Sequence, residues 1–195
     1  TNHWKDIKNA DVVLVMGANP AENHPCGFKW AIEARDENGA KLLTIDPRFT
    51  RTSAVADKHM QIRPGSDIAV LGGLIRYILT EDLHHADYVA EHTNASFLVN
   101  GDFGFEDGLF SGFEEAASAY DKTSWSYELG PDGYVRRDPT LEDPGCVFQL
   151  LKRHYDRYTP EMVAQIAGCS VEKFLEMAGI IGSTGRADRV GTIMY

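Results

Sequence analysis

The chain has 195 residues and a formal net charge of −10, because 29 acidic residues outnumber 19 basic ones. This length is enough for one domain of ordinary size and short for two. The negative charge repels polyanions, which argues against non-specific binding of nucleic acids. With 43% hydrophobic residues, the composition is that of a globular protein and excludes a disordered chain.

The three cysteines indicate neither a disulfide framework nor a cysteine-ligated metal centre. Cys26, Cys146 and Cys169 are odd in number, lie far apart and form no C-x-x-C pair. We therefore expect three separate buried thiols. The longest apolar runs are interrupted by glycine and arginine, so no membrane-spanning helix is predicted, and the first residues show no secretory signal.

The first part of the chain predicts strands that alternate with helices. Residues 11–16 and 41–45 are short, mostly apolar runs that predict buried strands. The residues between them have helical spacing up to Asn38, and the following Gly39 suits the left-handed position after a helix. A strand, a helix and a strand within about 35 residues are typical of a crossover between parallel strands.

A further strand and helix are predicted directly downstream. Residues 59–63 form the strand, and Ser66 is expected to cap the helix that follows. The apolar stripe of this helix is expected to consist of Ile68, Leu71, Leu74, Ile75, Ile78 and Leu79.

Residues 94–144 differ in character from the rest of the chain. Gly, Asp, Phe, Tyr and Ser dominate them, helical periodicity is weak, and residues 130–133 suggest the turn of a small hairpin, so we interpret the segment as an insertion. The residues after it predict three helices and a last strand, at 146–158, 160–167, 171–181 and 189–195. The predicted fold class is α/β, with a mainly parallel sheet and flanking helices, in a single unit of residues 1–195 that we expect to be cut at both ends.

The loop after the first predicted strand is rich in glycine, asparagine and proline. In open parallel sheets, ligands bind outside the carboxyl ends of the strands. Gly17 allows the backbone to approach a ligand closely, and Asn19 offers amide donors and acceptors. The loop matches neither the G-x-G-x-x-G pattern nor a Walker loop, and its composition is also typical of an ordinary turn.

The next two loops add charged side chains at the same edge. Asp46 stands where nucleotide-binding folds place an acceptor for a ribose or a base, and Arg48 offers a guanidinium that can bind phosphate through two hydrogen bonds. The alternative is that Arg48 and Arg51 form surface ion pairs. In the third loop, Asp67 is by default a carboxylate that stabilises the first turn of a helix.

In chain order, these loops contain the segments VMGANPAENHP, IDPRFTRT and RPGSD. The series resembles the molybdopterin-guanine-dinucleotide oxidoreductases of the dimethyl sulfoxide reductase family. Four further segments, TNHWKDIKNAD, EDGLFSGF, YDKTSWSYEL and RYTPEMV, are similar to the large catalytic subunit of respiratory formate dehydrogenases within that family. The resemblance covers essentially the whole chain.

The resemblance implies a Rossmann-like segment that binds one guanine dinucleotide of a bis-molybdopterin cofactor carrying molybdenum or tungsten. The residues that it assigns to the cofactor all lie in the three loops: Gly17, Asn19, Glu22, Asp46, Arg48, Gly65 and Asp67. The first loop would contact the phosphate or nucleotide part, the second the guanosine and pyrophosphate, and the third the guanine or ribose edge. For His24, a structural role and a role in proton transfer both stay open.

The same resemblance places the catalytic groups outside this chain. The selenocysteine or cysteine that binds the metal, its neighbouring histidine and the cysteines of a [4Fe-4S] cluster would precede Thr1, and an arginine on the substrate side would follow Tyr195. No catalytic or metal-ligating residue is therefore expected between these two positions.

The implied function is the oxidation of formate to carbon dioxide in a periplasmic enzyme of anaerobic respiration. The implied partners are the rest of the catalytic subunit and an iron–sulfur electron-transfer subunit, with no nucleic acid and no direct membrane insertion. The alternatives are a nitrate, polysulfide or arsenate reductase of the same family and a stand-alone nucleotide-binding module. The segments EDGLFSGF and YDKTSWSYEL favour formate dehydrogenase over the other reductases.

Overall fold

A computed structural model describes residues 3–106 and 108–195. The chain divides into two compact units, the first comprising Thr1–His84 and Tyr155–Tyr195 and the second His85–His154. Residues 94–144, which the sequence predicts as an insertion, lie inside the second unit. Among the residues described, no helix combines the length and the apolar character needed to cross a membrane.

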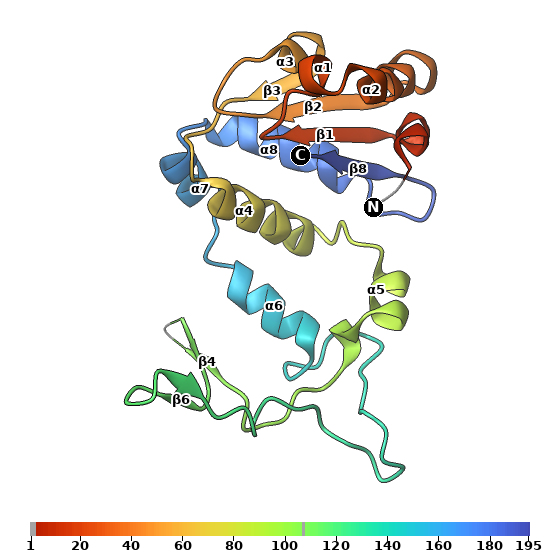
Figure 1. Ribbon diagram of the computed structural model, residues 1–195. Helices are drawn as coiled ribbons and strands as arrows, with labels where there is room; N and C mark the ends of the chain where they lie inside the picture. Colours follow the sequence, from red (N-terminus) through yellow and green to blue (C-terminus); the bar gives the residue numbers. More distant parts are fainter. Residues whose placement is uncertain (1–2, 107) are drawn as a thin grey trace. The chain divides into compact units, whose positions relative to one another are not determined.

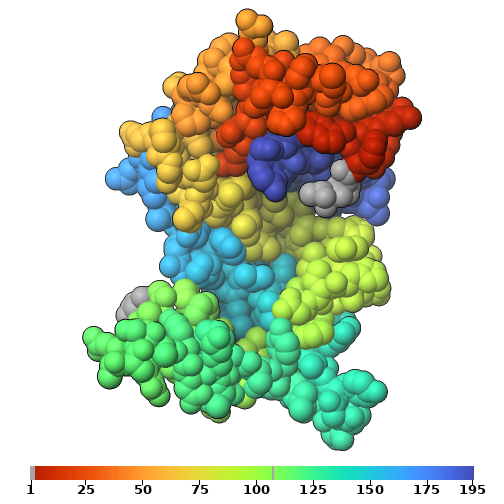
Figure 2. Space-filling view, in the orientation of Figure 1, coloured from red at the N-terminus to blue at the C-terminus, as the bar shows by residue number. Residues whose placement is uncertain are grey.

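The first unit is built on a four-stranded sheet with the order β3-β2-β1-β8 (Figure 1). The strands are β1 (Val12–Met16), β2 (Lys41–Ile45), β3 (Lys58–Met60) and β8 (Gly191–Met194). All neighbouring strands are parallel, so their carboxyl ends lie at one edge. The predicted parallel α/β architecture is confirmed. In Figure 2, residues near the C-terminus, in blue, lie beside N-terminal residues in red.

Three of the predicted strands are shorter in the structure than in the sequence analysis. The first begins at Val12 and not at residue 11. The third strand ends at Met60 and not at residue 63, because the N–H of Arg63 donates to the carbonyl of Ala167 and not to a neighbouring strand. The last strand begins at Gly191, two residues later than predicted.

Helix α2 (Pro25–Asn38) covers one face of the sheet (Figure 1). Its buried residues Phe28, Ala31 and Ala34 pack against the strand residues that point to this face. The helix ends as predicted, with Gly39 in the left-handed conformation at φ 67°. Cys26, in the first turn, is exposed, which contradicts the prediction of a buried thiol, whereas Cys146 is buried.

Three helices cover the opposite face of the sheet: α4 (Asp67–Thr80), α7 (Pro160–Ala167) and α8 (Val171–Gly182). Together with residues from β1, β2 and β3 they form the larger hydrophobic core of this unit. Phe174 and Met177 of α8 lie in this core with no exposed surface. The predicted helices at 160–167 and 171–181 are confirmed to within one residue.

The apolar stripe predicted for α4 is confirmed only in part, because Leu74 is buried but the other members are not. Three of its members are exposed in the structure: Ile68 (75%), Leu71 (41%) and Ile75 (38%). The helix instead buries a face that contains Gly73, where an added Cβ would lie 2.5 Å from Val163 and 2.8 Å from Phe174. Because a glycine allows this close approach, the face with small residues packs against the core.

Several short helices were not predicted. In the first unit these are the 3-10 helix η1 (Trp4–Asn9), α1 (Pro20–Asn23) and α3 (Arg51–Val55). Segments of 4 to 6 residues are too short to show helical periodicity in the sequence. Ser66 lies at the start of α4 as predicted, but its hydroxyl donates to the carbonyl of Arg63 at 2.6 Å and does not cap the helix.

The second unit contains little regular structure. Its elements are α5 (Ala86–His92), η2 (Asn94–Ser96), β4 (Phe105–Glu106), β5 (Leu109–Phe110), β6 (Phe113–Glu114), β7 (Ala119–Tyr120) and α6 (Val147–Tyr155). β4 pairs with β5, and β6 pairs with β7, both antiparallel. The predicted turn at 130–133 is present, since the N–H of Gly130 donates to the carbonyl of Tyr134 at 2.8 Å.

An exposed carboxylate on α8 makes the stability of the first unit depend on pH. Glu176 binds Lys58 at 2.5 Å and Lys173 at 2.9 Å, and these hydrogen bonds lower the pKa of Glu176 to about 2. Because the pKa is depressed in the folded state, this contribution to stability is present above the ordinary pKa and is lost as the pH falls toward 2. We expect Glu176→Gln to flatten the pH dependence of the urea midpoint at acidic pH.

The control for this experiment is Glu37→Gln, which removes an exposed carboxylate that has no ion pair among the residues described. Urea unfolding of the chain between about pH 3 and pH 7 compares the variants. Parallel pH profiles for Glu176→Gln and the wild type would contradict the assignment.

Candidate functional site at the carboxyl edge of the sheet

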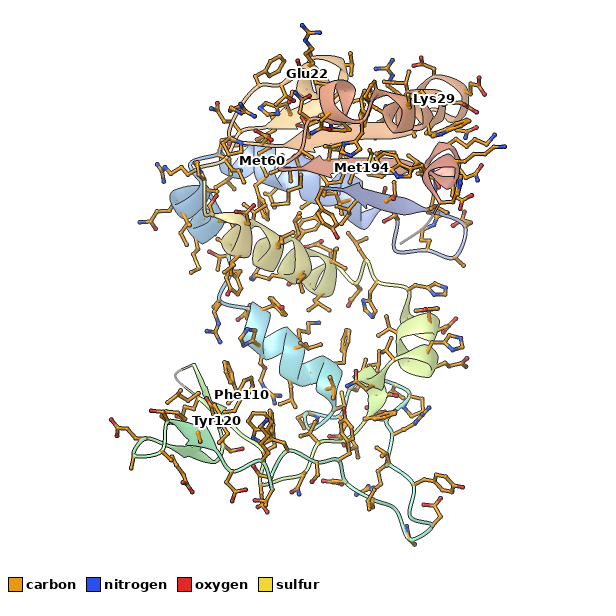
Figure 3. All side chains as sticks on the ribbon, in the orientation of Figure 1. Glu22, Lys29, Met60, Phe110, Tyr120 and Met194 are labelled. Carbon is orange, nitrogen blue, oxygen red and sulfur yellow. The ribbon has the colours of Figure 1, made fainter. Side chains whose placement is uncertain are left out.

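The three loops that follow β1, β2 and β3 start side by side at one edge of the sheet. The N–H of Gly17 donates to the carbonyl of Ile45 at 3.0 Å, and the N–H of Asp46 donates to the carbonyl of Met60 at 3.2 Å. Figure 3 labels Met60, the last residue of β3, and Glu22. Glu22 belongs to α1, which lies on the same side of the sheet as α3. The loops expected to carry the site are therefore neighbours, as the parallel sheet requires.

Hydrogen bonds between side chains join the first loop to the second. The side-chain oxygen of Asn19 accepts from the hydroxyl of Thr52 at 2.9 Å and from its N–H at 3.3 Å, while the Thr52 hydroxyl accepts from the N–H of Ala21 at 3.1 Å. The amide nitrogen of Asn19 donates to the carboxylate of Glu22. Asn19 thus positions the two loops relative to each other, with both ends of its amide engaged.

Thr52 is fully buried and was not among the predicted site residues. The only sequence signal was a pair of threonines in the second loop. We expect Thr52→Val to destabilise the fold by about 1–2 kcal/mol, because valine removes the hydroxyl that bonds Asn19 and Ala21 and leaves buried polar atoms without a partner. Urea unfolding measures the change. Thr52→Ser keeps the hydroxyl and is the control, and equal stability of both variants would contradict the role of the hydroxyl.

The two arginines of the second loop differ in their partners among the described residues. Asp46 is 7% exposed, and its carboxylate accepts from the N–H of Arg48 at 2.7 Å, which fixes the turn. Arg51 forms an ion pair with Glu22 at 3.2 Å. The side chain of Arg48 is exposed and makes no ion pair with any residue that the structure describes. The surface-ion-pair alternative therefore applies to Arg51, and the Arg48 guanidinium is available to an anion.

A histidine that the sequence analysis did not select lies beneath this loop. Nδ1 of His59 is 2.9 Å from the hydroxyl of Thr44, and the ring contacts Phe49 edge-on with centroids 5.2 Å apart. Burial lowers the pKa of His59; Asp46 acts in the opposite direction, and Lys173 adds to the lowering. The burial thus favours the neutral imidazole, which can both donate and accept one hydrogen bond.

The third loop is held in place by hydrogen bonds to the end of α7. The guanidinium of Arg63 donates to the carbonyls of Gln165 and Ile166 at 2.7 and 3.1 Å, at the end of α7. Gly65 has φ 81°, and Asp67 is the exposed first residue of α4. Among the described residues, no side-chain hydrogen bond connects Gly65 or Asp67 with the first two loops, so these residues share the edge but not the network.

The residues at this edge fit a phosphate-bearing nucleotide. Gly17 has φ 65°, and an added Cβ at Gly17 or Gly65 would meet no atom within 4 Å, so both loops present open backbone. The guanidinium of Arg48 can bind phosphate, and the carboxylate of Asp46 can accept from hydroxyl or amino groups. This combination of open glycine backbone, an arginine without an ion pair among the described residues and carboxylate acceptors suits a phosphate-bearing ligand.

His24 belongs to a different surface. Its ring stacks on Trp4 with centroids 5.5 Å apart, and its Nδ1 lies 2.7 Å from the side-chain oxygen of Asn23. Trp4, Asn23 and His24 line an open pocket at the start of α2, together with Pro25, Cys26, Gly27 and Trp30. His24 therefore has structural partners, but it does not join the network of Asn19 and Thr52.

Residues 1–184 match the family model described as molybdopterin oxidoreductase. The chain belongs to the molybdopterin oxidoreductase family. The match includes β1, β2 and β3 with the three loops that follow them, and it ends before β8.

Formate dehydrogenase subunits are among the relatives that are similar over the whole chain. The major subunit of the nitrate-inducible formate dehydrogenase of Escherichia coli is 52% identical over 195 residues, and formate dehydrogenase 2 subunit alpha (cytochrome c-553) of Nitratidesulfovibrio vulgaris is 51% identical. Both matches cover 100% of this chain but only 19% of the relative. They confirm the resemblance inferred from the sequence.

A solved structure shows the same fold. Acetylene hydratase from Pelobacter acetylenicus superposes with a TM-score of 0.60 at 20% sequence identity, covering 95% of this chain and 18% of the hydratase. At this identity the match supports the fold of this molybdopterin oxidoreductase segment and carries no information on its reaction.

Proposed function

We propose that this chain is a cofactor-binding segment of a formate dehydrogenase catalytic subunit, which oxidises formate to carbon dioxide with release of two electrons and a proton. The observation that carries the proposal is the 52% identity to a formate dehydrogenase major subunit over all 195 residues, the segment 94–144 included. A stand-alone nucleotide-binding module is less consistent with relatives in which the matched region makes up 19% of the length.

Within the enzyme, this chain would bind one guanine dinucleotide of the cofactor. The molybdopterin group, with molybdenum or tungsten, would supply the redox centre that receives the electrons. Arg48 would bind the pyrophosphate, and Gly17 and Gly65 would let the backbone approach it. Asp46 would accept hydrogen bonds from the guanosine. The charge of Glu22 is compensated by Arg51, so Glu22 would serve as an acceptor without repelling the phosphates.

The other parts of the enzyme would complete the electron path. A [4Fe-4S] cluster, held by residues of the catalytic subunit outside this chain, would supply the redox link to an iron–sulfur subunit in the periplasm. The names of the relatives, a major subunit and a subunit alpha, support an enzyme of several subunits.

Purification of the full-length gene product tests the proposal. We expect formate-dependent reduction of a viologen dye, bound molybdenum or tungsten, and two guanine nucleotides released per metal atom after acid hydrolysis. Consumption of nitrate, polysulfide or arsenate without formate oxidation would assign the protein to another reaction of the family. The 195-residue chain alone is expected to be inactive, and turnover by it would contradict the location of the catalytic groups elsewhere.

A further inference from the structure

The hairpins of the second unit carry a connected group of aromatic rings. Neighbouring ring centroids lie between 4.7 and 6.3 Å apart, and Figure 3 shows Phe110 and Tyr120 on this part of the chain. We call this group the aromatic platform: Phe103, Phe105, Phe110, Phe113, Tyr120 and Trp125. Such rings, when they meet edge to face or offset, form rigid contacts at low cost in conformational entropy.

The backbone beneath the aromatic platform is fixed by hydrogen bonds. The indole N–H of Trp125 donates to the carbonyl of Ser111 at 2.9 Å, and the Ser111 hydroxyl lies 2.8 Å from that of Ser124. At Gly112, φ is 84° and an added Cβ would lie 1.9 Å from the carbonyl oxygen of Asp121, so only glycine allows this approach. The aromatic side chains are therefore held in place before any partner binds, which favours association.

The aromatic platform is not part of a hydrophobic core. Among the described residues between positions 99 and 140, none is buried. Phe110 is 42% exposed, Phe113 38% and Trp125 36%, and Leu109 beside them is 45% exposed. The surface of these hairpins, in green, is seen in Figure 2. An exposed apolar patch with ordered aromatic residues is typical of the centre of a protein interface.

Acidic residues outnumber basic ones in the unit that carries the aromatic platform. Positions 85–154 contain 13 acidic and 5 basic residues, a formal charge of −8 out of −10 for the chain. Asp102, Glu106 and Glu114 stand next to aromatic residues in the sequence, and Glu115 follows Glu114; all four are exposed and form no ion pair with the residues described. Their negative charge is therefore free to attract a positively charged surface.

We propose that the aromatic platform is a docking surface for a second polypeptide, whose contact face presents lysine and arginine side chains around an apolar protrusion. The apolar centre would supply the binding energy, and the carboxylates would steer a basic partner and exclude acidic ones. Docking at this surface is independent of the reaction that the enzyme catalyses and of the loops at the edge of the sheet.

Photo-crosslinking in the full-length enzyme, isolated under mild conditions with the subunits that accompany it, tests this proposal. Benzoylphenylalanine replaces Phe113 in one variant and Tyr134 in the control, because Tyr134 is 76% exposed in the same unit but lies outside the aromatic platform. We expect the Phe113 variant to crosslink to a lysine- and arginine-rich segment of a different polypeptide, and the Tyr134 variant to give no such product. Raising sodium chloride from about 0.1 to about 0.5 M should lower the yield several-fold.

Charge variants examine the acidic rim separately. Glu114→Lys combined with Glu115→Lys should lower the crosslink yield at position 113 by about tenfold, and the corresponding glutamine pair should lower it less. Crosslinks confined to the same polypeptide would show that the catalytic subunit itself covers the surface and would overturn the proposal. The absence of any adduct, or a yield that depends neither on salt nor on these charges, would overturn it as well.

Discussion

Arg48→Ala in the full-length enzyme is expected to weaken retention of the cofactor by about 10- to 100-fold. The guanidinium of Arg48 has no ion pair among the residues described, so its loss would remove the proposed contact to the cofactor without breaking an ion pair of these residues. Charge-assisted hydrogen bonds of this kind contribute about 1.5–3 kcal/mol. Metal and guanine nucleotide per protein should therefore fall, while the rate per bound metal atom stays near that of the wild type.

Two further substitutions of arginine separate this role from a general effect of charge. Arg48→Lys should restore only part of the cofactor, because an ammonium group cannot reproduce the planar guanidinium. Arg51→Ala removes the same charge from the same loop but breaks the ion pair with Glu22, and is expected to change the metal content less. A full complement of metal in Arg48→Ala would remove Arg48 from the site.

Phe174→Ala is expected to lower the free energy of unfolding by about 3–5 kcal/mol, the largest effect predicted for any single residue. Phe174 has no exposed surface and lies in the core that joins the sheet to α4, α7 and α8. Alanine would leave a cavity where the backbone at Gly73 now approaches the ring, and helices cannot close such a gap without shifting.

Urea-dependent proteolysis of the full-length subunit, monitored by cleavage within residues 160–182, measures this change. Ile68→Ala is the matched control, because Ile68 lies in the same layer of helices but is 75% exposed, and a surface substitution of this kind changes stability by less than about 0.5 kcal/mol. Similar urea midpoints for Phe174→Ala and the control would contradict the assignment of Phe174 to the core.

The sequence predicted best those elements whose pattern is local. The strands at 12–16 and 41–45 are apolar runs of five residues, and the helix between them ends at a glycine, so each signal lies within the element itself. The buried face of α4 was predicted only in part, because side-chain hydrophobicity does not reveal a contact made through the backbone of Gly73. Which face of a helix is buried depends on residues of other helices and strands, which are distant in the sequence.

The residues of the candidate site likewise divide into those that a local sequence pattern indicates and those that depend on contacts between distant residues. Asp46 and Arg48 were found from their position after a strand, which topology alone indicates. The bond between Asn19 and Thr52 connects residues 33 positions apart, and no spacing rule connects such a pair. For the same reason, the sequence did not reveal which of the two arginines in the second loop would pair with Glu22.

The order of strands has a consequence for how the polypeptide reaches its native state. β8 pairs with β1, and the carboxylate of Asp11 accepts from the N–H of Val190, 179 positions later. A ribosome adding about 5–20 residues per second needs roughly 10–40 s to make the intervening stretch. Throughout this time one side of β1 lacks its neighbour, and parallel pairing across so long a separation is intrinsically slow. We therefore expect this side of β1 to stay unpaired in the nascent chain until β8 has been synthesised.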